Sequence, residues 1–323
     1  MDERETKCQA GDVMKPTIAA ILGGRFDRAR VNPVIWPGMP GLEGELGSNI
    51  NGPYPINVPG WIHDPLGKYY LYFAHHGGKY IRLAYADAVE GPYTVYKPGT
   101  LHLDQIGDKK HVASPEIVID ESERLIYMYF HVPCKGKKPY KDQGQMTFLA
   151  TSRDGIAFTP GQQQLAPFYL RVFKHGGYVY GLAKNDNKDG ILVRSRDGKT
   201  MFERGPELIP GFRHCDVLVR EDSLLVFFTR VGDAPERILL STVDITRDWR
   251  DWQFSVPVTI LEPEFEWEGS KLPLIPSKHG STGPANALRD PALLVDGNDL
   301  YLFYCVKGEQ GIACAKFIQS GFR

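Results

Sequence analysis

Histidine, arginine and acidic residues stand at the edges of short apolar runs along this 323-residue chain. Carboxylates and histidines can exchange protons with a bound molecule, and arginine can hold a carboxylate or a phosphate through two parallel hydrogen bonds. Such charges are costly to bury together unless they pair or bind something. The residues that could do this chemistry are Asn51, His75, His111, Glu116, His131, Arg171, Arg213, His214, Asp216, Arg230, Arg237, Arg289 and Asp290.

The elements that would position these residues are short strands that repeat along the chain. Helical periodicity is almost absent, and each unit has a polar turn, a run rich in aromatic and branched residues, and a further short apolar run. Five such runs match, at 69–73, 126–130, 178–182, 224–228 and 300–304. Four-stranded units at this spacing are typical of propeller blades. The sequence therefore predicts an all-β, five-bladed β-propeller rather than a β-sandwich, which would not explain five matching units.

The ring of blades needs an extra strand to close. The last unit has only three strands, and we expect Thr17–Leu22 to supply its outer strand, which would remove the sheet edges. The hydrophobic content of 42% is enough for a large core, so we expect one propeller domain over residues 1–323. Residues 1–16 should form a flexible N-terminal segment.

Composition excludes some classes of partner and favours a reducing compartment. The net charge of −1 offers no basic face for nucleic acid, and no apolar run is long enough to cross a membrane. Five cysteines without zinc-like spacing favour a reduced, intracellular protein. The N-terminus has no apolar signal region, which predicts a cytoplasmic location, or a periplasmic or secreted one if a leader was trimmed.

Propeller geometry sorts the chemical residues onto one face. The N-terminal ends of the inner strands and the loops between second and third strands open on the same side of a propeller. The residues named at the outset all fall in these two places. We therefore expect them to surround a central pocket.

Several short motifs resemble those of a known superfamily. They are Asn32–Ile35, Gly91–Tyr93, Ser114–Val118, Arg289–Leu294 and the Ser-Arg-Asp-Gly pieces at 152–155 and 195–198. With them the chain resembles the five-bladed propeller glycosidases, which include arabinanases, β-xylosidases, invertase, levansucrase and mannoside phosphorylases. The resemblance covers nearly the whole sequence. It implies a carbohydrate partner and a glycoside hydrolase-like enzyme acting on a small oligosaccharide or the end of a glycoside.

The chain departs from the arabinanase-like pattern in the first blade. There the inner strand of those enzymes carries an aspartate as general base, whereas residues 50–58 here contain no carboxylate. Glycoside hydrolysis normally uses two carboxyl groups. We therefore predict Glu116 as the acid, with Asp290 or Asp216 as base or pKa modulator and His214 beside them. A structural ion pair between Asp290 and Arg289 is the alternative.

The arginines leave two other functions open. If Arg171, Arg213, Arg230, Arg237 or Arg289 faces the pocket unpaired, the ligand is anionic, and a lyase or a phosphorylase follows. In a lyase, His or Tyr removes the C5 proton of a uronate while arginine neutralises its carboxylate. Alternatively Arg230 and Arg237 pair with Asp233 and Glu236 in their own loop. A non-catalytic sugar-binding propeller is the third hypothesis.

Two carboxyl groups about 5–10 Å apart would favour hydrolysis, and a pocket ringed by Arg and His with one carboxylate would favour the other enzymes. The histidines come from different blades without a diagnostic spacing, so we expect no metal or cofactor, although a single channel cation such as calcium stays open. Trp267 in the segment between the last two blades is a candidate platform for a sugar ring, unless it packs on the rim. Trp249 and Trp252 should pack between blades.

Overall fold

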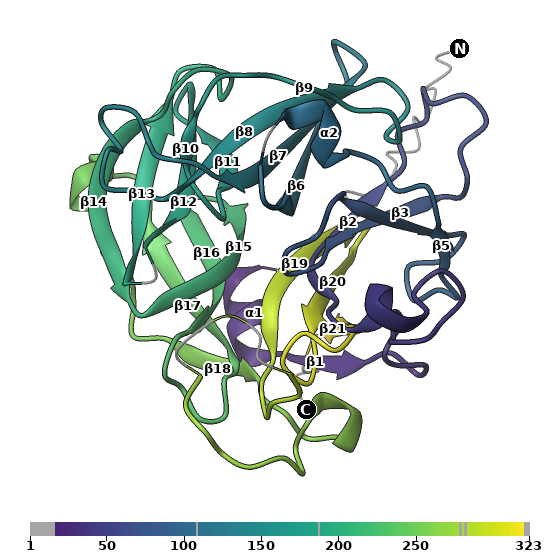
Figure 1. Ribbon diagram of the computed structural model, residues 1–323. Helices are drawn as coiled ribbons and strands as arrows, with labels where there is room; N and C mark the ends of the chain where they lie inside the picture. Colours follow the sequence, from purple (N-terminus) through teal and green to yellow (C-terminus); the bar gives the residue numbers. More distant parts are fainter. Residues whose placement is uncertain (1–16, 108, 187, 278–279, 281–282, 320–323) are drawn as a thin grey trace, which may run out of the picture.

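The computed structural model describes residues 17–107, 109–186, 188–277, 280 and 283–319. Five antiparallel sheets surround a common centre, as predicted (Figure 1). From the inner strand outwards, the first blade consists of β2 (Asn51–Asn57), β3 (Tyr69–Ala74), β4 (Arg82–Ala86) and β5 (Thr94–Tyr96). The second consists of β6 (Ala113–Asp120), β7 (Leu125–Pro133) and β8 (Gln145–Ser152), with the short outer strands β9 (Thr159–Pro160) and β10 (Ala166–Pro167). The third consists of β11 (Arg171–His175), β12 (Tyr178–Asn185), β13 (Asp189–Ser195) and β14 (Glu203–Pro210). The fourth is β15 (Phe212–Arg220), β16 (Ser223–Arg230), β17 (Ile238–Asp244) and β18 (Val258–Leu261).

The fifth blade joins the two ends of the described chain. Its strands are β19 (Arg289–Asp296), β20 (Asp299–Cys305), β21 (Ile312–Ile318) and the N-terminal β1 (Arg25–Arg28). Figure 1 shows β1 beside β21, so closure by an N-terminal strand is confirmed. The prediction that Thr17–Leu22 forms this strand was wrong. Residues Ile18–Gly23 form helix α1, because the Thr17 hydroxyl accepts a hydrogen bond from the Ala20 N–H and caps the helix.

The second strand of each blade is apolar on both of its faces because neighbouring blades cover both. In β3, Tyr70 and Tyr72 belong to the core shared with the second blade, whereas Leu71 and Phe73 belong to the core shared with the fifth. This arrangement produces continuous apolar runs instead of the alternation of a half-buried strand. Trp249 and Trp252 are buried in the core between the third and fourth blades, as predicted.

The repeated Ser-Arg-Asp-Gly motif connects successive blades. The Tyr72 hydroxyl donates to the Gly155 carbonyl at 2.7 Å, and the Tyr129 hydroxyl donates to the Gly198 carbonyl at 3.0 Å. Both glycines have positive φ, and a Cβ on either would lie within 3 Å of the tyrosine oxygen. The motif is therefore explained by blade packing.

Bulges bend the inner strands where they enter the channel. Gly52, Ser114 and Asp290 each precede a proline, have φ between 48° and 58°, and coincide with a shift of strand register. Bulges of this kind re-aim neighbouring side chains. These bulges therefore change the direction of polar side chains at the channel entrance in three of the blades.

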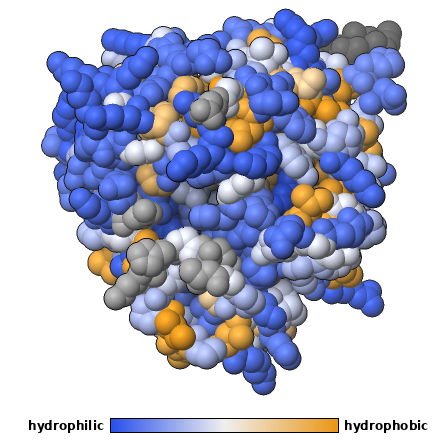
Figure 2. Space-filling model, in the orientation of Figure 1, coloured by the Kyte–Doolittle hydropathy of each residue, from blue (hydrophilic) through white to orange (hydrophobic). Residues whose placement is uncertain are grey.

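The described residues contain no helix long and apolar enough to cross a bilayer. Figure 2, viewed from the same side as Figure 1, shows a mostly hydrophilic surface with separate apolar patches. The N-terminal segment 1–16 lies outside the described residues. Two short helical turns near the surface, α2 (Leu103–Ile106) and the 3₁₀ turn Glu266–Glu268, belong to connections between blades.

Candidate functional site

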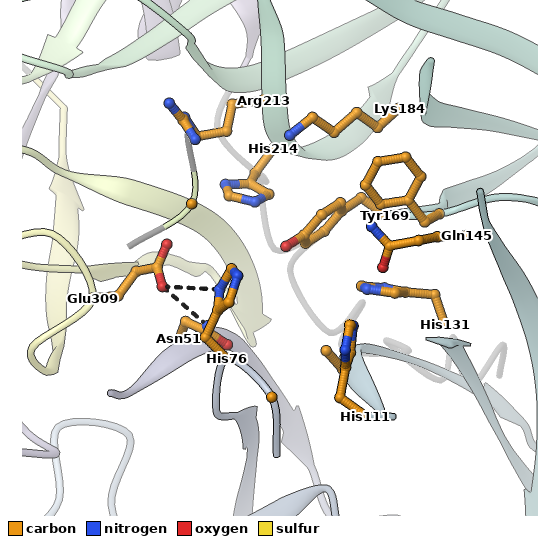
Figure 3. A pocket seen from close by; sticks show the side chains of 14 residues that line it. Asn51, His76, His111, His131, Gln145, Tyr169, Lys184, Arg213, His214 and Glu309 are labelled. Carbon is orange, nitrogen blue, oxygen red and sulfur yellow. Dashed lines mark hydrogen bonds and ion pairs between the residues drawn. The ribbon is translucent and has the colours of Figure 1, made fainter. Parts of the chain in front are cut away.

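A polar pocket lies at the N-terminal ends of the inner strands. Its volume is about 120 Å³, and all five blades or their connections contribute to it. Figure 3 shows the side chains that surround it. The lining residues are Asn51, His76, Gly77, His111, Ala113, His131, Gln145, Phe168, Tyr169, Lys184, Arg213, His214, Gly280 and Glu309. The predicted gathering of histidine and arginine on one face is therefore present in the structure.

His214 and Asp290 form a buried pair at this pocket. The Asp290 carboxylate contacts His214 Nδ1 and also accepts the Gly52 N–H at 3.0 Å and the Cys305 S–H at 3.2 Å. Burial lowers the pKa of His214 to about 4 despite the nearby carboxylate. Burial alone would raise the pKa of Asp290, but His214 and the Gly52 N–H together hold it below its ordinary value.

This pair fixes the imidazole in one orientation. A neutral His214 that donates its Nδ1–H to Asp290 keeps a lone pair on Nε2, which is the form of a general base. The His214 ring lies edge-on to Tyr169, with ring centroids 4.4 Å apart. Figure 3 shows the Tyr169 hydroxyl directed into the space between His214 and His76. Two sequence-predicted residues, His214 and Asp290, are thus brought together in a geometry that can move a proton.

Tyr169 and Lys184 form the wall contributed by the third blade. Tyr169 has a φ of 55°, which is strained for a bulky residue and is the kind of conformation that collects at functional sites. The Lys184 ammonium lies 5.3 Å from the centre of the Tyr169 ring. Burial, followed by the charge of Arg213, lowers the pKa of Lys184 to about 7. A bound anion would favour the charged form of this lysine.

A chain of buried ion pairs runs along the side of the pocket contributed by the fourth and fifth blades. Arg213 Nε lies 2.7 Å from Glu236, Arg289 Nε lies 2.8 Å from the other Glu236 oxygen, and Arg289 Nη1 lies 3.1 Å from Glu309. Arg213 also donates to the Ser277 carbonyl and hydroxyl at 2.9 Å. This network holds Arg213 and Glu309 in place at the pocket.

Glu309 is the lining carboxylate that the sequence analysis did not name. It is 3% exposed, and it accepts hydrogen bonds from Asn49 and Asn51. Lys307, Gly308 and Glu309 all have positive φ in the tight turn between β20 and β21. That turn directs Glu309 inwards, and no spacing in the sequence signals it.

Glu116, Asp216 and Arg171 lie further along the channel and do not line the pocket. The Glu116 carboxylate accepts the Val172 N–H at 2.7 Å, and Asp216 accepts the Leu293 N–H at 2.6 Å. Each bond joins an inner strand to that of the next blade. Burial raises the pKa of Glu116 to about 8 and that of Asp216 to about 6. Their catalytic roles stay predictions, and these contacts offer a structural explanation for both residues.

Arg171 lies in the middle of the channel. Its guanidinium is 3.9 Å from Glu116, interacts electrostatically with Asp216 and lies 5.3 Å from the centre of the Tyr54 ring. The inner strands of four blades therefore surround it. No group of three or more His, Cys, Asp or Glu side chains among the described residues is arranged to hold a metal ion.

Six residues predicted to bind substrate lie outside the described lining of the pocket: His75, Arg171, Arg230, Arg237, Arg289 and Trp267. Arg230 is 3.5 Å from Asp233, as the alternative hypothesis expected, but Glu236 pairs with Arg213 and Arg289 instead of Arg237. Trp267 stacks on Phe265 and packs against the core of the last two blades. The rim interpretation of Trp267 therefore fits the structure better than a sugar platform.

The fold is that of the five-bladed propellers to which many glycosidases belong. Among solved structures, a glycosyl hydrolase from Bacteroides ovatus has a TM-score of 0.60 at 13% identity, covering 94% of this chain and 96% of its own. An α-L-arabinofuranosidase from Lactobacillus brevis has a TM-score of 0.60 at 14% identity, covering 89% and 93%. A β-xylosidase/α-arabinofuranosidase from a compost microbial metagenome, in complex with xylotriose, has a TM-score of 0.57 at 12% identity, covering 92% and 96%.

A protein with clear sequence similarity places the chain in a family. An uncharacterized protein of Acanthamoeba polyphaga mimivirus is 36% identical over 304 residues, which span 83% of each chain. This chain belongs to the same family as that viral protein. No established family model matches the sequence.

Proposed function

We propose that the protein is a carbohydrate-active enzyme that cleaves the terminal residue of a small, anionic saccharide by elimination. The glycosidase-like fold supports a sugar substrate, and the small pocket favours the end of a chain. The observation that carries the proposal is the combination of the His214–Asp290 pair with Lys184 and Arg213 around one cavity. A base beside Lys184, together with Arg213, which is ion-paired with Glu236, suits the carboxylate of a uronate.

Each part of the reaction has a candidate group. His214 Nε2 would take the proton from C5 of the uronate, and Lys184 with Arg213 would stabilise the negative charge that develops on its carboxylate. The electron pair of the C5–H bond then forms the C4=C5 double bond as the bond from C4 to the leaving oxygen breaks. The leaving oxygen takes up a proton, so the products are an unsaturated uronate and a free hydroxyl.

Direct hydrolysis has less support from the geometry of the described residues. Hydrolysis needs two carboxyl groups that flank the scissile bond, and Glu309 is the carboxylate found in the described lining. The sequence-based pair, Glu116 with Asp216 or Asp290, is engaged in bonds between blades or to His214. Hydrolysis with Glu116 as the acid is therefore the competing hypothesis.

Phosphorolysis is the second candidate. Lys184, Arg213 and the imidazoles of the pocket could hold inorganic phosphate, and phosphate brings its own nucleophile where the described lining offers Glu309 as its one carboxylate. The same cations thus serve either reaction. The products distinguish the two.

The test is an assay of wild type, His214→Gln and Glu116→Gln on matched oligosaccharides, one neutral and one with a uronate that carries a sugar on its O4, with and without phosphate. Products are identified by mass and by the ultraviolet absorbance of an unsaturated uronate. Unsaturated products that disappear in His214→Gln support elimination. Sugar phosphates that require added phosphate support phosphorolysis. Products that have gained water, and that are lost in Glu116→Gln, would overturn both and restore the hydrolase hypothesis.

A further inference from the structure

A second pair of histidine and carboxylate borders the same pocket. His76 Nδ1 lies 3.7 Å from Glu309, and Asn49 binds both partners, donating to Glu309 at 2.9 Å and accepting the His76 backbone N–H at 2.8 Å. The His76 side chain is 51% exposed, whereas Glu309 is buried. Figure 3 shows His76, Asn51 and Glu309 together on one side of the space, with His214 on another.

The two pairs have opposite protonation tendencies. Interaction of the His76 ring N–H with the Glu309 carboxylate raises the pKa of His76 above its ordinary value against partial burial, and the charges of Glu309 and Asp290 add to this effect. Burial instead lowers the pKa of His214. Two titratable groups whose environments separate their pKa values in this way are the usual arrangement of an acid and a base in one site. The other charged or titratable groups near His76 are His75, His111, His131 and Arg289.

Glu309 is rigidly held, so it can fix the orientation of His76. Its carboxylate accepts hydrogen bonds from Arg289, Asn49 and Asn51, and Glu309 itself has a positive φ. Gly280 packs so closely on the imidazole that a Cβ there would lie 2.5 Å from the ring. His76 therefore lies between the buried Glu309 carboxylate and Gly280 at the edge of the pocket.

We propose that His76 is the general acid that protonates the leaving oxygen, that Glu309 positions it, and that His76 and His214 act as acid and base across the pocket. The inference rests on the proposed function and adds the source of the second proton. His76 gives its proton to the oxygen as the bond to C4 breaks, while His214 receives the proton from C5. Proton exchange with solvent then restores both imidazoles.

Two measurements test this assignment, and the first does not depend on any substrate. Imidazole signals of ¹⁵N-labelled protein are titrated by NMR in wild type and Glu309→Gln, with His76→Gln and His214→Gln to assign the signals. We expect His76 to remain protonated to higher pH than His214, and Glu309→Gln to lower the pKa of His76. A neutral His76 throughout the neutral range, or a titration that Glu309→Gln does not change, would overturn the proposal.

The second measurement compares leaving groups. On a saccharide with an ordinary sugar leaving group, His76→Gln should lose about a hundredfold or more in rate, and far less on an activated aryl leaving group that needs no proton. His175→Gln, on the opposite face of the propeller, is the control for loss of an imidazole. Equal losses on the two substrates would overturn the role of His76. If wild type cleaves no uronate at all, the proposed function fails, and the NMR titration still decides whether the two imidazoles differ in protonation.

Discussion

Asp290→Asn is the sharpest test of the proposed base because it replaces one carboxylate oxygen by an NH₂ group and changes almost no volume. The asparagine oxygen can still accept the Gly52 N–H, but its amide would then donate to His214 Nδ1. The imidazole proton would move to Nε2, and no lone pair would face the pocket. A general base contributes about 10²- to 10⁴-fold, so the barrier should rise by about 3–5 kcal/mol. The measurement is kcat at saturating substrate between pH 5 and pH 8, and retention of more than about a tenth of wild-type kcat would refute the reasoning.

Asp216→Asn provides the matched comparison. Asp216 is as buried as Asp290, lies on the inner strand of the adjacent blade and also accepts an N–H from a neighbouring blade. It contacts no histidine among the interactions found in the structure. The two variants should therefore lose comparable stability in thermal unfolding, whereas Asp290→Asn should lose far more activity. An equal loss of kcat in both would favour the carboxylate-pair hypothesis.

Three further predictions concern the charged side chains of Lys184, Glu268 and Arg171. Because the pKa of Lys184 is about 7, affinity for a monomeric uronate measured by calorimetry should fall as pH rises above 7, and Lys184→Met should bind weakly with no such pH dependence. Glu268→Gln should lower the free energy of unfolding, measured in urea, by about 1–3 kcal/mol and leave kcat unchanged, because buried Glu268 forms an ion pair with Arg28 of the closing strand β1. An unchanged urea midpoint would contradict this. Dialysis against EDTA should leave activity and melting temperature unchanged, because Arg171 already supplies the positive charge between the acidic side chains of the channel; loss of either would show that a cation is needed.

Most of the fold was predictable from the sequence because the blades repeat a pattern set by packing. Strands covered on both faces must be apolar throughout, as Tyr70, Leu71, Tyr72 and Phe73 show, and five copies of that pattern specify a propeller. The closing strand was misplaced because Thr17–Leu22 is as apolar as a strand. What decides its structure is the local cap at Thr17, which favours a helix over a pairing partner distant in sequence.

The candidate site was predictable only in part. The sequence indicated which face would collect the charged residues, and His111, His131, Arg213 and His214 do line the pocket there. It could not distinguish a lining side chain from one that bridges two blades, since both occupy the start of an inner strand. Glu116 and Asp216 accept backbone N–H groups of neighbouring strands, and that engagement depends on how blades are arranged around the axis.

Two of the lining residues missed by sequence reasoning share a backbone feature. Tyr169 and Glu309 have positive φ, as do Asp290 and Ser114 at the entrances of their strands. These conformations cost about 1–3 kcal/mol each for residues other than glycine, and they persist only where the surrounding structure enforces them. Neither composition nor spacing predicts them, because any glycine or asparagine would fit the turn more easily. Tyr169 and Glu309 nevertheless line the pocket and Asp290 holds His214, so backbone strain at these three positions places polar side chains at the candidate site, as expected where a local rule is broken for function instead of for stability.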